Sequence, residues 1–541
     1  MGHDKGNVPL TLVLLVALLC TLSTAAGQPP SRVRCGFAAV ITPEYLNKIE
    51  AGIQAQLRPE LPLFVEDASG RFRVHYTTTG ADAVPAADTD GNGIPDYVDE
   101  CLAALALAWA VEVDTLGYLA PPSDLGEGGS NAIDVYLRDL SKAGPSGSSY
   151  YGVTRLDRSI GSGPARFTTW IEIDNNFSAE DVDAAGNQSF GTFGIDGARV
   201  TCAHEFHHTI QNGSYGLAST QLMFYELTST WMELRTWPRI RDWAIYMSAL
   251  LNTPEQWPMS DPASFNGYLW GWYGNVFSAS HPDLLRDAWN RIRSGSQPFS
   301  SLLQACAAGG QSLADMFHAN LLSMYYTGSR GGSNTLVPGA SELPEVRLWD
   351  DVNVTADAVT SIGALRPFEV RALRFAIPSN SGPDPVSATV LLTWPEESLF
   401  AQGSTFAQQT YNVTVTNSLQ PGDAAIAGTQ WGVRVLPESI RYVIDGAQTV
   451  TPGAPYPQPL RLSANTPLSV PVGGAVVGTP VTVTISTVNM VGIASETTKV
   501  VLDGTRLVAK LSLNADIPPG TYVATTECLG VTNMFKIAVV R

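Results

Sequence analysis

Stretches with a helical pattern and stretches with a strand pattern divide the chain. Tyr97–Leu119, rich in Ala and Leu, predicts a helix that stops at Gly117. A second helical pattern runs from Gly197 to Trp237 and is interrupted near Asn212 and Gly213. Alternation of apolar and polar residues predicts strands elsewhere. The shorter predicted elements are a helix over Thr42–Leu57 and strands over Arg71–Thr79, Asn131–Leu137 and Thr168–Ile173.

The pattern changes in the second half of the chain. Helical patterning persists to about Tyr326, whereas residues 345–541 are rich in Val, Thr, Ser, Pro and Gly and alternate with a period of two, as in Val390–Trp394, Tyr411–Thr416 and Val481–Val488. We therefore expect a multidomain protein. Its parts are an α+β domain (28–340) and two all-β sandwich-like modules (345–450 and 451–541), divided near Pro452–Pro459.

The N-terminus indicates export. An apolar run, Val8–Leu22, follows Lys5 and is itself followed by the small residues of Ser23–Gly27. This order is typical of a secretory signal peptide, here residues 1–27. The run is shorter than the ~20 residues of a membrane span, so we expect a secreted protein without a transmembrane anchor. Five cysteines remain after cleavage, and Cys35 and Cys101 are candidates for a disulfide.

The charge composition of the chain limits the kinds of partner that we expect it to bind. The 541 residues include 32 Lys and Arg against 50 Asp and Glu, a formal net charge of −18. Such an acidic balance argues against nucleic acid as a partner. It fits either a plain solvated surface or a role in cation binding. Seven of the 12 Trp lie between Trp231 and Trp289 and favour a large aromatic core over the wall of a substrate cleft.

The sequence HEFHH, from His204 to His208, matches the H-E-x-x-H pattern of zinc metalloproteases. We expect Asp196 to cap a helix on which His204 and His208 lie one turn apart on one face and bind zinc. Glu205, beside the first ligand, would take the proton of a zinc-activated water. His207 faces away and is interpreted as packing or as support for a ligand. The alternative is a helix with surface histidines.

The third zinc ligand must come from another segment. The metzincin pattern fails, because no His follows Gly213 until His281. Glu226 and Glu233, two turns apart, face the same way on the next predicted helix. Glu226 is the preferred ligand because its distance from His208 suits a glutamate-ligand zincin. Glu233 is the alternative ligand, and whichever glutamate does not bind the metal would orient a ligating His from the second shell.

A transition-state stabiliser should donate to the developing oxyanion. Tyr268, Tyr273 and His281 are candidates downstream of the motif, and Tyr273 is preferred. The alternative is that Tyr273 is a packed aromatic.

An acidic loop before the first long helix predicts a calcium site. Oxygen ligands recur with the spacing of an EF-hand loop, and Gly93 stands where the loop turns sharply. The last ligand is Asp rather than Glu, which is closer to the calcium loops of thrombospondin type 3 or dockerin repeats. We expect one structural Ca²⁺, and an acidic turn without metal is the alternative. The expected ligands, within residues 88–99, are Asp88, Asp90, Asn92, the carbonyl of Ile94, Asp96 and Asp99.

Several blocks occur in an order that resembles a known family. They are DTDGNGIPDYVDE (Asp88–Glu100), LGYLAPP (Leu116–Pro122), IDVYL (Ile133–Leu137), IEIDNNF (Ile171–Phe177), HEFHHTIQ (His204–Gln211), ELTSTWMEL (Glu226–Leu234) and YYTGSR (Tyr325–Arg330). Together they resemble the MXAN_6640-type secreted bacterial metalloproteases, of gluzincin character, over roughly residues 70–335. The resemblance implies His204, His208 and Glu226 as zinc ligands and Glu205 as base. The chain departs from the family at His207 and Leu227.

The sequence thus predicts a secreted zinc endopeptidase that requires Zn²⁺ and Ca²⁺ and acts on a protein or peptide substrate. Its α+β domain over residues 28–340 would be a zincin-like metallopeptidase domain. The β modules would serve surface or polymer attachment, substrate docking or stability. One alternative is a secreted binding or adhesion protein that retains zinc only as a structural element. Another is a zinc hydrolase of a non-peptide amide.

Overall fold

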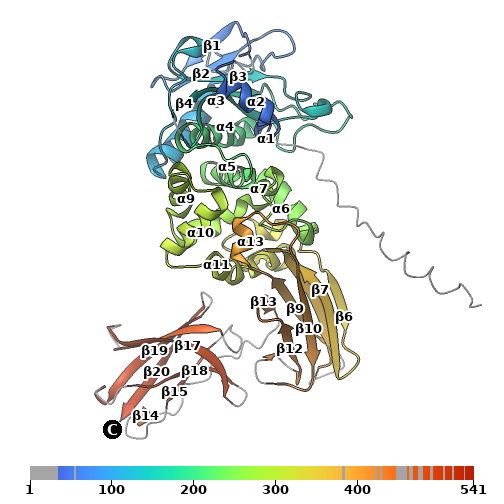
Figure 1. Cartoon of the computed structure of the whole chain (residues 1–541), viewed down its shortest axis with the longest axis vertical. Coiled ribbons are helices and arrows are strands. Elements are labelled where there is room, and N and C mark those ends of the chain that lie inside the picture. The colour runs from blue at the N-terminus through green and yellow to red at the C-terminus, as the bar shows by residue number, and fades with distance from the viewer. Residues whose placement is uncertain are drawn as a thin grey trace, which may run out of the picture.

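A computed structural model of the full chain defines the fold (Figure 1). It describes residues 35–53, 57–161, 163–379, 384–420, 423–426, 429–445, 460–461, 467–472, 479–487, 491–503, 506–513, 517–528 and 531–540. The predicted signal peptide, residues 1–27, lies outside them. The described part is a mixed α/β structure with several sheets.

The first sheet has five strands in the order β1-β2-β3-β5-β4. β2, β3 and β5 are parallel to one another, whereas β1 is antiparallel to β2 and β4 is antiparallel to β5. The central strands are buried along almost their whole length, as expected for strands covered on both faces. β4 is an edge strand. The bounds are β1 (Leu63–Glu66), β2 (Phe72–Tyr76), β3 (Ile133–Arg138), β4 (Gly152–Ile160) and β5 (Arg166–Asp174).

Two long helices, α3 (Asp96–Trp109) and α4 (Gly194–Ile210), pack on each other and on this sheet. Each continues into a turn of π-helix, over Ala110–Thr115 and Gln211–Tyr215. The first ends before Gly117, whose φ of +73° reverses the chain. Two short helices, α1 (Phe37–Val40) and α2 (Pro43–Glu50), contact β4.

A helical layer follows below the sheet in Figure 1. The predicted aromatic core is confirmed, because Trp231, Trp243, Trp270, Trp272 and Trp289 are all almost fully buried there. The helices are α5 (Leu222–Thr236), α6 (Trp243–Asn252), α7 (Ser264–Trp270), α8 (Gly274–Ser280), α9 (Leu284–Arg293), α10 (Pro298–Ala308), α11 (Leu313–Ala319) and α12 (Leu322–Tyr325).

The next unit is a sandwich of two four-stranded sheets, in the orders β11-β12-β10-β7 and β13-β9-β8-β6. It packs on the helical layer through Phe368 and Phe400, which join the same apolar cluster as the helices. The bounds are β6 (Asp350–Asn353), β7 (Ala358–Leu365), β8 (Val370–Ile377), β9 (Val386–Thr393), helix α13 (Glu397–Ala401), β10 (Gln409–Thr416), β11 (Ala424–Ala425), β12 (Gly432–Leu436) and β13 (Arg441–Asp445).

The C-terminal unit is one curved seven-stranded sheet, a half-barrel, in the order β14-β20-β19-β16-β17-β18-β15. The prediction of a second sandwich needs correction, because the long strand β17 pairs with both β16 and β18 and so joins two halves into one sheet. One apolar cluster lies inside its curve. The bounds are β14 (Leu460–Arg461), β15 (Leu468–Pro471), β16 (Pro480–Thr487), β17 (Gly492–Asp503), β18 (Arg506–Leu511), β19 (Gly520–Cys528) and β20 (Val531–Val540).

The predicted helices and strands that were read from the sequence are present with shifted ends. The helix predicted over Thr42–Leu57 is shorter and ends at Glu50. The predicted cap at Asp196 is wrong, because α4 begins two residues earlier at Gly194 and Asp196 instead pairs with Arg199 at 3.1 Å.

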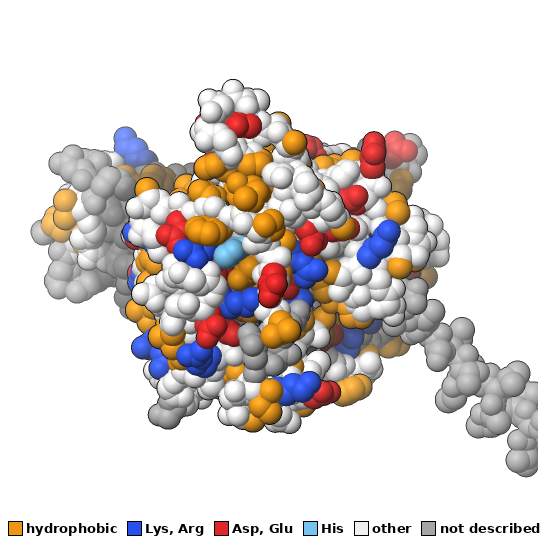
Figure 2. Space-filling model, turned by 90° about the horizontal axis from the view of Figure 1, so that it is seen from above, with side chains coloured by type: hydrophobic (Ala, Val, Ile, Leu, Met, Phe, Trp, Pro, Cys, Tyr) orange, Lys and Arg blue, Asp and Glu red, His pale blue; other side chains and the backbone are white. Residues whose placement is uncertain are grey.

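The surface does not separate side chains by charge on the face shown in Figure 2. Figure 2 shows acidic, basic and apolar side chains interspersed on the face seen from above the N-terminal sheet. Among the helices within the described ranges, none combines the length and apolar character needed to cross a membrane.

Candidate metal centre

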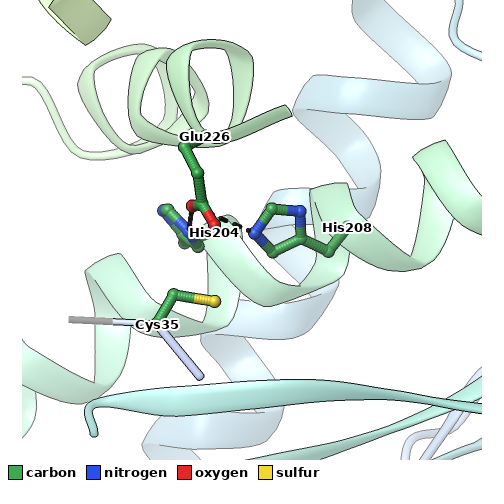
Figure 3. Close-up of side chains that lie close together, drawn as sticks. All are labelled: Cys35, His204, His208 and Glu226. Atoms are coloured by element: carbon green, nitrogen blue, oxygen red, sulfur yellow. Dashed lines mark hydrogen bonds and ion pairs between the residues drawn. The ribbon is translucent and has the colours of Figure 1, made fainter. Parts of the chain in front are cut away.

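The H-E-x-x-H segment lies on α4, which contacts β4 and β5 of the first sheet and helix α5. His204 and His208 are both almost fully buried, so the alternative of surface histidines is wrong. Their imidazoles project from one face of α4 towards α5, which carries Glu226 (Figure 3). Nε2 of His204 lies 3.1 Å and Nε2 of His208 lies 3.3 Å from the same carboxylate atom, Oε2 of Glu226. Three potential ligands therefore meet at one point.

The other ring nitrogen of each histidine is held by an oxygen atom. Nδ1 of His204 lies 2.6 Å from Oε1 of Glu233, and Nδ1 of His208 lies 2.7 Å from Oε1 of Gln211. An acceptor at Nδ1 keeps the proton there and leaves the Nε2 lone pair for a metal. Glu233 therefore takes the orienting role and Glu226 faces the shared point.

Gln211 is fixed in this orientation by its own amide group. Its Nε2 donates to the carbonyl oxygen of Tyr225 and to the hydroxyl groups of Thr228 and Ser229 at 3.0 to 3.1 Å. The amide oxygen is thereby directed at His208. Gln211 opens the π-helical turn after α4, a type of irregularity that is frequent at functional sites.

The pKa values of His204 and Glu226 are both shifted by the contacts between these buried groups. Burial alone would lower the pKa of His204, but its hydrogen bonds to Glu226 and Glu233 outweigh burial and raise the pKa to about 9. Burial alone would raise the pKa of Glu226, but the charge of His208 and the bond to His204 lower it to about 2. The negative charge of Glu226 and a positive charge on the His204 imidazole thus stabilise each other.

The donor set fits a zinc ion. Two neutral imidazole nitrogens and a carboxylate oxygen are the ligand types of catalytic zinc sites. Nε2 of His208 and Oε1 of Glu226 are buried and make no hydrogen bond with the described residues, so both keep lone pairs available for a cation.

Glu205 lies beside this point with one oxygen held and one open. Its Oε2 is 2.7 Å from the hydroxyl oxygen of Thr154 on β4, whereas its Oε1 is buried and has no hydrogen-bond partner among the described residues. The held oxygen fixes the carboxylate between α4 and the edge strand. The open oxygen suits a group that exchanges a proton with a small ligand.

A fourth potential ligand comes from the N-terminus of the described chain. The thiol of Cys35 lies with His204, His208 and Glu226 in one group whose ligand atoms are all within 4.8 Å of one another (Figure 3). The predicted disulfide to Cys101 is wrong, because both thiols are free. Cys101 instead lies beside Cys202, whose Sγ is 3.8 Å from the Cys101 carbonyl oxygen.

Two aromatic rings enclose the histidines. The ring of Phe37 stacks on His208 at a centroid distance of 4.3 Å, and the ring of Tyr268 stacks on His204 at 5.9 Å. Burial and the charge of Glu226 raise the pKa of the Tyr268 hydroxyl well above its usual value. Burial thus favours the neutral hydroxyl of Tyr268, which can donate a hydrogen bond.

The structure does not place the other two candidate stabilisers at the centre. Tyr268 lies within α7, whereas Tyr273 lies after the end of α7, in the 3-10 turn Gly271–Tyr273. Its ring packs against Phe317 and its hydroxyl donates to the carbonyl oxygen of Met316 at 3.5 Å, which corresponds to the packed-aromatic alternative. His281 lies at the turn between α8 and α9.

His207 lies on the far side of α4, as predicted, and it is fully buried there. Its Nδ1 is 2.8 Å from Oε2 of Glu112, in the π-helical turn after α3. Burial lowers the pKa of His207 and raises that of Glu112, so burial favours the neutral form of each group. The pair ties α4 to α3 behind the metal centre.

The acidic loop forms a second, exposed cluster. Carboxylate oxygens of Asp88, Asp90 and Asp96 lie within 4.8 Å of one another. Asp99 joins them through the side chain of Asn92, whose Nδ2 donates to Asp99 at 2.9 Å and to Asp90 at 3.1 Å. The oxygen of Asn92 accepts from the backbone N–H of Ile94 instead of facing the carboxylates. Gly93 has a φ of +87°, which allows the sharp turn.

Comparison with known proteins adds no family. No family model, no curated protein and no solved structure matches the chain. The resemblance to secreted metalloproteases therefore stays a prediction, and the geometry of the centre is what supports a function.

Proposed function

We propose that the chain is a secreted zinc-dependent endopeptidase with a zincin-like catalytic domain. The observation that carries the proposal is the convergence of His204, His208 and Glu226 on one buried point with Glu205 beside it. His204, His208 and Glu226 would hold the ion. When bound, zinc supplies Lewis acidity that polarises a carbonyl and lowers the pKa of a coordinated water to about 7.

The roles of the chain's own residues follow from their surroundings. Glu205 takes a proton from the attacking water on its open oxygen and returns it to the leaving amine, while Thr154 holds the other oxygen. Tyr268, with its raised pKa and its position over His204, replaces Tyr273 as the donor to the developing oxyanion. Glu233 and Gln211 orient the two imidazoles.

The edge strand β4 supports a peptide as the substrate. One side of β4 pairs with β5, and its outer side passes the centre at Gly152 and Thr154. An exposed strand edge binds an extended peptide by main-chain hydrogen bonds. A Cβ at Gly152 would lie 2.8 Å from Cγ of Glu205, so glycine permits this close approach of strand and helix.

Calcium is proposed as a second, structural cofactor. Three carboxylates held close together on an exposed loop repel one another unless a cation lies between them. The loop leads directly into α3, which packs on α4, so the ion would stabilise the scaffold of the centre. Export through residues 1–27 and attachment through the C-terminal β units complete the proposal.

One observation favours a second candidate. Four potential ligands, Cys35 included, are what a closed structural zinc site requires, and such a site belongs to a non-catalytic binding or adhesion protein. A closed structural site gives no role to the carboxylate of Glu205. We therefore prefer the enzyme.

Cleavage of a peptide library distinguishes the enzyme from a protein with a closed structural zinc site. We expect zinc by elemental analysis and hydrolysis that is abolished by Glu205→Gln, inhibited by phenanthroline and restored by zinc. Because Cys35 shares the centre, the comparison is made both in the native background and in Cys35→Ser. If the protein binds zinc while neither background shows hydrolysis that depends on Glu205, that result would contradict the enzyme and favour the structural zinc site.

A further inference from the structure

We propose that the thiolate of Cys35 is a fourth zinc ligand and that the segment Cys35–Glu50 keeps the peptidase latent by occupying the position that water and substrate would take. The inference rests on the proposed zinc centre and adds its regulation. It is carried by three independent contacts of this segment, with the ligands, with the edge strand and with a ligating ring.

The first contact is at the ligands themselves. Cys35 is almost fully buried, and its sulfur lies with the ligand atoms of His204, His208 and Glu226 (Figure 3). A protein site of three such ligands is catalytic only while its fourth position stays open to water. Thiolate sulfur is a zinc ligand of high affinity. Cys35 therefore closes the position that the reaction needs.

Burial and the charges of Glu205 and Glu226 raise the pKa of the Cys35 thiol well above its usual value, so the thiolate requires the charge of the bound ion. One backbone donor also favours the thiolate. The backbone N–H of Phe37 points at Sγ of Cys35 from 3.2 Å. A donor at this distance stabilises a thiolate over a thiol.

The second contact is along β4. Cys35 forms a parallel bridge with Gly152, and the N–H of Gly36 donates to the Gly152 carbonyl oxygen at 2.8 Å. Further along, the hydroxyl of Tyr45 on α2 donates to the carbonyl oxygen of Leu156 at 2.7 Å. The segment thus takes up the edge hydrogen bonds that an extended substrate would use.

The third contact fixes the segment in place. Phe37 is fully buried and its ring stacks on the imidazole of His208. Glycine at position 36 allows the segment to lie this close to β4, because a Cβ there would lie only 2.4 Å from Cγ2 of Val153. Release requires that Cys35 leave the centre as a thiol, with a proton from solvent water, so that a water molecule can enter beside Glu205.

X-ray absorption at the zinc edge tests the ligand directly in the full chain. We expect one sulfur neighbour at about 2.3 Å in the native protein and only nitrogen and oxygen neighbours in Cys35→Ser. Cys306→Ser is the matched control, since Cys306 is another buried free thiol, on α10, and should keep the sulfur signal. The native spectrum alone decides coordination, even if a variant folds poorly.

Peptide hydrolysis then tests latency. We expect Cys35→Ser to cleave peptides about tenfold or more faster than the native chain, and the gain to disappear when Glu205→Gln is added. Zinc without a sulfur neighbour would overturn the inference and leave the zinc centre standing. Absence of zinc from the native protein would overturn both proposals. Sulfur coordination without any gain in hydrolysis would overturn latency and indicate the closed structural site.

Discussion

Nδ1 of His204 lies 2.6 Å from Oε1 of Glu233, and both side chains are about 1% exposed. A carboxylate at this distance fixes the ring tautomer and strengthens the ligand. Glu233→Ala should lower zinc affinity about 10- to 100-fold, and Glu233→Gln should lose less because an amide oxygen still accepts the Nδ1 proton. Competition with a chelating indicator measures the affinity. Glu342→Gln, at an exposed glutamate, is the control, and equal affinities in Glu233→Ala and the native protein would contradict the role.

A close approach of two helices should control the third ligand. A Cβ at Gly267 on α7 would lie 2.4 Å from the carbonyl oxygen of Met223 and 2.5 Å from Cβ of Glu226 on α5. Gly267→Ala must push α5 away and should weaken zinc binding by at least the loss expected for Glu233→Ala. The chelator competition applies here too. The control is Gly332→Ala, where a Cβ meets nothing within 4 Å, and unchanged zinc affinity in Gly267→Ala would contradict the argument.

How much of the centre the sequence predicts depends on whether contacts are local. His204 and His208 are brought together by one helix, so their spacing is enough to place them side by side. Gln211 is also local, three residues after His208, and its position on the same helix face is a signal that sequence reasoning missed. Glu226 and Glu233 share a face of one helix, but only packing of α5 on α4 shows which of them meets the shared point.

The contacts that sequence reasoning missed join distant segments. Cys35 and Thr154 reach the centre through pairing at the edge strand β4, and the sequence of β4 lacks a clean alternation that would have predicted the strand. The same limit applies to the fold. Val481–Val488 is recognisable as a strand, but whether β16 belongs to a sandwich or to one curved sheet depends on its neighbours.

Calcium should raise thermal stability. Ligand that binds only the folded state stabilises by about 2.7 kcal/mol at a concentration 100 times its Kd. Asp96→Asn removes one of the three clustered carboxylates and should reduce the calcium-dependent rise in Tm, whereas Asp114→Asn, at an exposed aspartate beyond α3, should not. Scanning calorimetry with calcium and with EGTA makes the comparison. A melt that is the same in both would show that the loop holds no calcium.

Arg58 should be a large contributor to the stability of the N-terminal sheet. Its guanidinium contacts Asp124 at 3.0 Å, Asp157 at 2.9 Å and also Asp134, and all four side chains are at most 9% exposed. Arg58→Ala leaves buried carboxylates unpaired, which costs about 3–5 kcal/mol. Urea unfolding measures the loss. Arg374→Ala is the control, because its ion pair with Asp351 is about half exposed and should be worth less than about 1 kcal/mol. Equal losses in the two variants would contradict the assignment.

The junction between the helical layer and the sandwich should weaken as pH falls. Nε2 of His318 on α11 lies 2.9 Å from the carbonyl oxygen of Tyr442 on β13, so this nitrogen carries the proton. Burial lowers the pKa of His318 below 6.5, and the positive charge of Arg441 adds to the effect, against the Tyr442 hydrogen bond and the charge of Asp315. The unfolded chain then binds more protons than the folded one between the lowered pKa and about 6.5.

Because the unfolded chain binds more protons than the folded chain in this pH range, the free energy of unfolding rises with pH there. It falls as the solution is acidified below about pH 6.5. His318→Gln keeps an N–H donor for the Tyr442 carbonyl oxygen and removes the titrating group. Its Tm should therefore fall less than that of the native protein between about pH 7.5 and about pH 5.5. His281→Gln, at the turn after α8, should keep the native pH dependence. If His318→Gln and the native protein lose equal Tm on acidification, another group is responsible, because the hydrogen bond is preserved and only the titration differs.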